Sequence, residues 1–355
     1  KEVDEEIKFT VDPRWQQISF PAGWKEEDSA SCDGSQAQGF NISANCAPFL
    51  LKGANRGAWA MPGLTVPVAL KIISGAKTRL TAHLTQPSPG AFAFEIRGTW
   101  AKSTASKEMF LPIHDTRPWA EALFRRALRK QKIAVNRITL ASFEPRELIF
   151  PSPNLSQIIQ PFNKNSVNFL GDALLKTLAA ANPSSGLGLR DSGLENLRAH
   201  LAEEGLSQGH VLNDGSGLSR TSRVNPRMIY TYLSQAMSRP YFTALLNSLP
   251  VAGVDGTLQD RMTRPPAKGV LRAKTGTLDG VYNLAGYVPH GDTYVPFVML
   301  SRTAANRGAV VRPTLDRVGQ QLTGLHSAGP RAELPTFAPH FPIPFVKEHS
   351  GENRR

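Results

Sequence analysis

The segment Lys274-Thr275-Gly276-Thr277 brings together groups that can bind and polarise a peptide. A lysine beside a cleft holds a carboxylate and lowers the pKa of a neighbouring hydroxyl. A glycine has no Cβ, so an extended ligand can lie against the strand and pair with its backbone. The backbone N–H of Thr277 is placed to serve as an oxyanion donor. The plainer alternative is an exposed edge strand on which Lys274 discourages pairing with another chain.

A second polar pair, Ser166 and Asn168, lies about a hundred residues upstream. At a helix start, these two side chains can point together into a cleft, where the hydroxyl relays a proton and the amide binds a substrate carbonyl. Penicillin-binding proteins and class A β-lactamases combine such a pair with a Lys-Thr-Gly strand and a Ser-x-x-Lys element. The alternative is that Ser166 only caps the helix that follows it.

The elements that must position these residues follow from the apolar patterns. From Phe40 to about Ile113, short alternating runs separated by glycine and proline predict a β-rich module. The pattern changes at Asp115-Thr116-Arg117-Pro118, which indicates the start of a helix. Farther on, segments 270–277, 281–288 and 294–301 with short turns between them predict an antiparallel meander that carries Lys274.

Helical spacing of apolar residues is found in several later segments. One helix is expected from Ser166 onwards, and another from Ser192, which forms a capping-box pattern with Glu195. A last helix is expected from about Pro313 to Leu325. We therefore divide the chain into a β-rich region over 1–115, a domain of helices and strands over 116–326, and a proline-rich tail over 327–355 without a fold of its own.

Composition narrows the classes of protein. Apolar residues make up 41% and charged residues 20% of the 355 positions, which is typical of a globular protein. No apolar run is long enough for a helical membrane span. The net charge of +12 fits contact with an anionic partner such as a wall polymer or a membrane surface. No nucleic-acid motif accompanies it, so we do not predict binding to nucleic acid.

The chain has two cysteines, Cys32 and Cys46, in a segment rich in glycine, serine and asparagine. Two cysteines are too few for a structural zinc site. They fit a disulfide that closes a short loop in an oxidising compartment, and the alternative is a pair of free thiols.

Longer stretches resemble one family, the D-alanyl-D-alanine carboxypeptidase/endopeptidase family of penicillin-binding proteins (low-molecular-mass class C, peptidase family S13). The resemblance is carried by LNDGSGLSRTSRVNPRMI, LPVAGVDGTLQDRM, LRAKTGTLDGVYNLAGYV and NKNSVNFLGDALLKTLA, and by AGWKEEDSASCDG around the first cysteine. It implies an α+β fold: a penicillin-binding, transpeptidase-like domain whose antiparallel sheet is flanked by helices, with an inserted β-rich module. It also implies a Cys32–Cys46 disulfide and a periplasmic or secreted location.

The resemblance implies acyl transfer at serine on peptidoglycan peptides, recognition of β-lactams, and no metal or other cofactor. It gives no oligomeric state. The matching residues are Ser166 as proton relay, Asn168 as substrate ligand, Lys274, Thr275 and Gly276 as the third motif, and Thr277 at the oxyanion position.

The family's nucleophile is the serine of a Ser-x-x-Lys helix. The one match in this sequence, Ser74 to Lys77, lies in a β-branched stretch with glycine beside the serine, so we expect it not to be catalytic. We therefore expect a fragment without its nucleophile, which penicillin does not acylate. The alternatives are a non-catalytic wall-binding protein and a β-lactamase-like hydrolase; the length and the inserted module argue against the latter. The coding sequence upstream of Lys1 would separate the first two.

Overall fold

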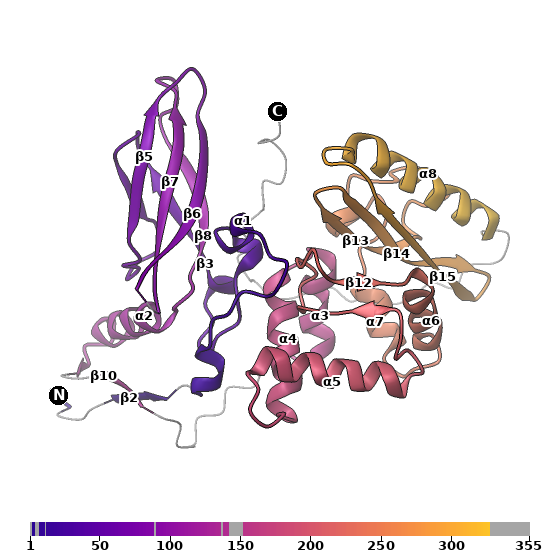
Figure 1. The fold of residues 1–355 in the computed structure, drawn as a ribbon, viewed down its shortest axis with the longest axis horizontal. Helices are drawn as coiled ribbons and strands as arrows, with labels where there is room; N and C mark the ends of the chain where they lie inside the picture. The colour runs from indigo at the N-terminus through magenta and orange to yellow at the C-terminus, as the bar shows by residue number, and fades with distance from the viewer. Residues whose placement is uncertain are drawn as a thin grey trace. The chain divides into compact units, whose positions relative to one another are not determined.

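A computed structural model describes residues 2–3, 7–10, 12–88, 90–135, 138–141 and 152–326. The described chain forms two compact units, and each unit has hydrophobic core clusters of its own (Figure 1). The first unit contains the described residues up to 141 together with 172–193, and the second contains 152–171 and 194–326. The predicted tail over 327–355 lies outside the described residues.

Strands dominate the first unit in the stretch where alternation predicts them. One sheet has the order β4-β3-β8 and the other the order β5-β7-β6, with β5 parallel to β7 and β6 antiparallel to it. Phe94 and Ile96 alternate along β7 and are fully buried in the core of this unit. The strands are β3 (Cys46–Leu51), β4 (Gly57–Trp59), β5 (Val68–Ser74), β6 (Arg79–Ser88), β7 (Ala91–Trp100) and β8 (Lys107–Pro112).

Helix α2 (Arg117–Lys130) begins where the Thr116-Arg117-Pro118 pattern predicts, with Pro118 in its first turn. Trp119 and Ala120 bury its first turn against the unit. The remaining elements of this unit are β1 (Glu2–Val3), β2 (Ile7–Thr10), η1 (Pro13–Gln16), α1 (Glu26–Ser29), η2 (Cys32–Gly34), η3 (Ser43–Asn45), β9 (Ala134–Val135) and β10 (Ile138–Ala141).

The predicted disulfide is confirmed: Cys32 and Cys46 are bonded, and their Cα atoms are 5.5 Å apart. The bond joins η2 to the first residue of β3. It therefore holds the irregular segment between these elements against the sheet.

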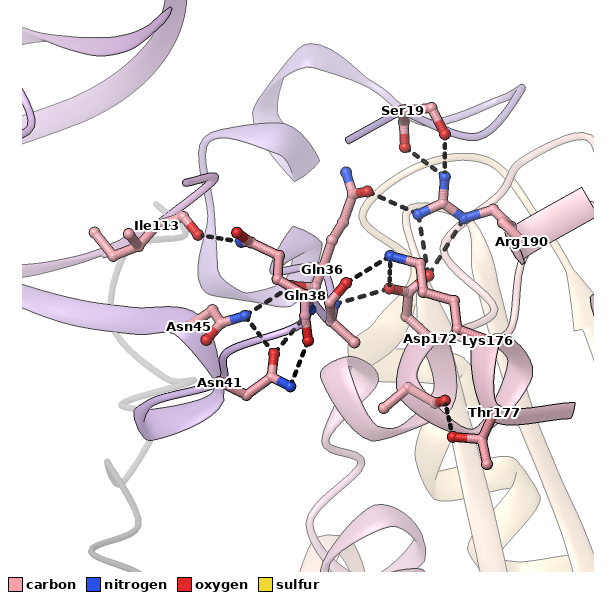
Figure 2. A network of polar contacts seen from close by, with 12 residues as sticks. Ser19, Gln36, Gln38, Asn41, Asn45, Ile113, Asp172, Lys176, Thr177 and Arg190 are labelled. Atoms are coloured by element: carbon pink, nitrogen blue, oxygen red, sulfur yellow. Dashed lines mark hydrogen bonds and ion pairs between the residues drawn. The ribbon is translucent and has the colours of Figure 1, made fainter. Parts of the chain in front are cut away.

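A buried ionic network lies in the first unit (Figure 2). The carboxylate of Asp172 accepts from Lys176 Nζ at 3.0 Å and from Arg190 Nη2 at 3.0 Å, and all three side chains are less than 8% exposed. Asp172 also accepts from the backbone N–H of Ala37 at 2.8 Å, while Lys176 donates to the Ala37 carbonyl at 2.6 Å. The network thus ties the segment before the disulfide loop to two helices.

The second unit is built on the predicted meander, an antiparallel sheet of order β13-β14-β15. Helix α8 covers one face, where Leu315 packs with Leu271, Ala273 and Leu284. Helices α6 and α7 meet the other face, where Leu246 and Leu249 pack on Tyr287. The strands are β13 (Arg272–Leu278), β14 (Val281–His290) and β15 (Thr293–Arg302), with a separate pair, β11 (His210–Val211) and β12 (Arg223–Val224). The α+β fold expected from the sequence is confirmed.

Two helices begin earlier than their sequence patterns predict. Helix α5 begins at Leu189, because Ser192 does not cap it: this buried side chain accepts the N–H of Ser184 at 2.7 Å instead. Helix α8 begins at Gly308 and contains Pro313. Among the described residues, no helix has the length and apolar content to cross a membrane. The helices from residue 152 onwards are α3 (Leu155–Lys164), α4 (Asn168–Ala181), α5 (Leu189–Glu203), α6 (Pro226–Ala236), α7 (Phe242–Ser248), η4 (Gly256–Leu258) and α8 (Gly308–His326).

Candidate active site

Strand β13 forms an edge of its sheet, because within the described residues only β14 pairs along it. On the outer side, Ala273 donates its N–H to Pro250 and Leu271 accepts from Ala252, both at 3.0 Å. Backbone groups alternate along a strand, so those of Thr275 and Thr277 face the same outer side. The Thr277 N–H, the predicted oxyanion donor, therefore faces the open edge rather than β14.

The side chain of Lys274 lies on the face of the sheet opposite to α8. Ala273 is buried in the core beneath α8, and adjacent side chains in a strand point to opposite faces. The ammonium of Lys274 donates to Ser166 Oγ at 2.7 Å and to the Thr275 carbonyl at 2.8 Å. Because an ammonium has three N–H groups, one remains for a ligand.

Burial lowers the pKa of Lys274 to about 8, because the charged form loses solvation. Near neutral pH the side chain is mainly cationic, but a small fraction is neutral. It can therefore hold a carboxylate as a cation and accept a proton at little cost.

Ser166 lies between α3 and α4 in the left-handed region, with φ of 56°. Because α4 begins at Asn168, Ser166 is not the residue that caps it. A non-glycine residue in this region is uncommon, and such strain is found at functional sites. The hydroxyl accepts from Lys274 and keeps its own proton to donate, which is the arrangement of a proton relay.

The turn Asp255-Gly256-Thr257 is a part of the site that the sequence motifs did not identify. The Thr275 hydroxyl donates to Thr257 Oγ1 at 2.9 Å, so the hydroxyl after Lys274 is held by this turn. Gly256 has φ of 57°, and a Cβ there would lie 2.3 Å from the carbonyl oxygen of Lys164. Only glycine therefore allows the turn to lie against the end of α3.

An ion pair fastens the same turn to α3. Lys164 Nζ is 2.6 Å from Asp255 Oδ2, and Asp255 Oδ1 accepts from the Val251 N–H at 2.8 Å. Burial lowers the pKa of Lys164, and the pairing with Asp255 opposes that effect. Because Lys164 is two residues before Ser166, the turn links the Ser166 segment to strand β13. Its only sequence signal was the stretch LPVAGVDGTLQDRM, which assigns no role to Thr257.

The remaining predicted residues have no direct bond to Lys274. Asn168 is half-buried at the first position of α4, and Thr277 is exposed. A Cβ at Gly276 would meet only the side chain of Asn283, at 3.4 Å or more, which is ordinary contact. Packing does not require glycine at 276, so the open strand edge is the better reason for it.

Ser74 lies elsewhere, at the end of β5 in the first unit. Ser74 and Lys77 are both exposed, and neither is in a helix. They lack the shared buried helix face that lets a lysine activate a serine three residues before it. Within the described ranges, no group of three or more His, Cys, Asp or Glu side chains could hold a metal ion.

Comparisons with known proteins agree with this arrangement. The D-Ala-D-Ala carboxypeptidase 3 (S13) family matches residues 6–322. A D-alanyl-D-alanine carboxypeptidase of Actinomadura sp. (strain R39) is 40% identical over 156 residues, which are 42% of this chain and 29% of that protein. The D-alanyl-D-alanine carboxypeptidase DacB of Haemophilus influenzae is 26% identical over 283 residues, 75% of this chain and 58% of that protein.

The fold is similar to the crystal structure of penicillin binding protein 4 (dacB) from Haemophilus influenzae. The TM-score is 0.71 at 24% identity, over 90% of this chain and 75% of that one. A second structure of the same protein, described as complexed with a β-lactam, gives a TM-score of 0.65. This similarity establishes the penicillin-binding fold of the chain.

Proposed function

The chain belongs to the D-Ala-D-Ala carboxypeptidase 3 (S13) family, and on that premise we propose that its second unit carries the substrate site of a serine-type D-Ala-D-Ala carboxypeptidase or endopeptidase. The substrates are peptidoglycan peptides, and β-lactams occupy the same site. The observation that carries the proposal is the 2.7 Å hydrogen bond from Lys274 to Ser166. It joins the two motif segments through a cation with a lowered pKa and a hydroxyl that can move a proton.

The peptide binds along the open edge of β13. Its backbone pairs with the outward groups of Thr275 and Thr277, and Gly276 leaves room for it to lie flat. Its terminal carboxylate takes the remaining N–H of Lys274. The scissile carbonyl then accepts from the Thr277 N–H.

Ser166 and Asn168 act on the reacting end. Ser166 passes its proton to the leaving amine and is reprotonated through Lys274, for which a pKa of about 8 is suitable. The amide of Asn168 binds a substrate carbonyl. It has no hydrogen-bond partner among the side chains that the structure describes, so it is available to do so.

The attacking serine is supplied from outside these 355 residues. Support comes from the setting of Ser74, whose exposed strand offers neither the helix nor the desolvated lysine that the reaction needs. The second oxyanion donor, which the family takes from the nucleophile's own N–H, is then supplied with it. The site acts in the periplasm or outside the cell, which the Cys32–Cys46 disulfide supports.

The test separates binding from chemistry. The chain should bind an acyl-D-Ala-D-Ala peptide measurably in calorimetry and an acyl-L-Ala-L-Ala peptide much more weakly. With a fluorescent penicillin, intact mass should show no adduct on this chain, and a form extended by a Ser-x-x-Lys segment should be labelled at that serine. An adduct on Ser74 would overturn the assignment, and one on Ser166 would make that residue the nucleophile.

A further inference from the structure

The first unit contains a cavity that the proposed function does not use. Its volume is about 150 Å³, and its lining includes Gln16, Ile18, Phe92, His114 and Arg117. Because one water occupies about 30 Å³ of the liquid, several waters or a small organic group can fit. Ile18 and Phe92 supply apolar wall, so the cavity is not lined by polar groups alone.

His114 presents a hydrogen-bond acceptor to this cavity. The ring is 2% exposed, and its Nε2 is 2.8 Å from the carbonyl oxygen of Ser29. A carbonyl only accepts, so Nε2 carries the proton and Nδ1 has a free lone pair. Burial lowers the pKa of His114 to about 4, so the ring is neutral at physiological pH. Nδ1 is buried and has no hydrogen-bond partner among the described residues.

Gln16 presents a hydrogen-bond donor to the same cavity. Its Nε2 is also buried, and no described residue accepts from it. A buried polar atom without a partner costs about 1–3 kcal/mol, so native proteins rarely contain two around one space. An acceptor and a donor that both lack partners therefore indicate a ligand that supplies both.

The charge of the cavity wall selects a neutral ligand. Arg117 Nε and Nη2 each donate to the carboxylate of Asp115 at 2.8 Å, so this cation and anion neutralise one another. His114 is neutral as well. A phosphate or carboxylate would have to break the Arg117–Asp115 pair, and a neutral group would not.

We propose that this cavity binds a neutral secondary amide, whose N–H donates to His114 Nδ1 and whose carbonyl accepts from Gln16 Nε2. One amide satisfies both orphaned atoms, and its methyl or alkyl end packs on Phe92 and Ile18. An acetamido group on an amino sugar and a peptide bond share this chemistry. The site is independent of Lys274, and its test measures binding only.

The test uses two substitutions that separate the nitrogens of His114. In His114→Asn the amide oxygen takes the place of Nδ1, so the cavity keeps its acceptor while the bond to Ser29 is lost. In His114→Gln the amide nitrogen takes the place of Nε2, so the Ser29 bond is kept while the acceptor is lost. A purely structural role predicts that His114→Gln is harmless. The proposal predicts that it is the variant that loses the ligand.

The probes are N,N′-diacetylchitobiose, its deacetylated form, and N-acetylalanine methylamide, each titrated by NMR at millimolar concentration. We expect at least one acetylated probe to bind and to shift the His114 Nδ1 resonance, with at least tenfold loss in His114→Gln and Gln16→Leu. The exposed neighbour Gln17→Leu should bind as wild type. The saccharide or the methylamide as the better ligand identifies the source. No binding by either, or equal binding by the deacetylated sugar, overturns the proposal and leaves water as the occupant.

Discussion

Lys274 Nζ lies 2.7 Å from Ser166 Oγ, although 108 positions separate the two residues. Lys274 is directed to this position by the alternation of β13, since Ala273 is committed to the core beneath α8. Ser166 is held in place by its left-handed backbone between α3 and α4. A proton can therefore move between two side chains that are each positioned by their own backbone.

The lowered pKa of Lys274 predicts a pH profile for peptide binding. The amine is cationic below its pKa, so affinity for a peptide carboxylate should be full below pH 7 and fall as pH rises through about 8. An ordinary lysine, with a pKa of about 10.4, would keep that affinity to much higher pH. Calorimetry from pH 6 to 10 with an acyl-D-Ala-D-Ala peptide measures the profile. A profile that stays flat to pH 9.5 would show that Lys274 does not hold the carboxylate.

Two controls accompany this profile. A peptide that ends in a carboxamide should bind without the inflection, because it has no charge to pair. In Lys274→Arg, whatever affinity remains should be independent of pH up to 10, because guanidinium does not lose its proton there.

Thr257 should support binding through Thr275. Thr257→Val removes the oxygen that accepts from the Thr275 hydroxyl, which should weaken peptide binding by about 5- to 10-fold, or roughly 1 kcal/mol. Thr257→Ser keeps the oxygen and should bind nearly as wild type. In a double-mutant cycle with Thr275→Val, the two losses should be non-additive by about 0.5–1.5 kcal/mol. Strict additivity would mean that the two hydroxyls act independently.

The sequence predicted the residues of the two motifs but not what joins them. The meander follows from alternation and turns, and the Ser166 and Lys274 motifs follow from the family resemblance, so their meeting was expected. The role of Thr257 depends on a tertiary contact with Thr275, and no local pattern encodes such a contact. Ser192 failed for a related reason: a capping-box pattern is local, but its hydroxyl is used by Ser184.

Gly256 and Gly291 form a matched pair for testing the turn against α3. Their φ angles are 57° and 56°, so an alanine at either position bears a similar backbone strain of roughly 1–2 kcal/mol. A Cβ at Gly291 has nothing within 4 Å, whereas one at Gly256 meets the Lys164 carbonyl. In urea denaturation, Gly256→Ala should therefore lose at least about 2 kcal/mol more than Gly291→Ala. It should also weaken peptide binding, because Lys164 must move and Ser166 follows it. Equal losses for the two variants would remove the close contact as the reason for glycine.

Asp172 should be among the most costly acidic residues to replace in the first unit. Asp172→Leu leaves the cations of Lys176 and Arg190 buried without their anion, which costs about 3–5 kcal/mol. Glu121→Leu is the control: it breaks a more exposed pair with Arg125 at 2.9 Å and should cost less than about 1 kcal/mol. Replacing all three network residues, as Asp172→Leu with Lys176→Met and Arg190→Met, should recover much of the loss, because no buried charge is then uncompensated. Urea denaturation of the variants measures each step. A loss below 1 kcal/mol for Asp172→Leu alone would show that water reaches these cations and that the network is not a closed ionic core.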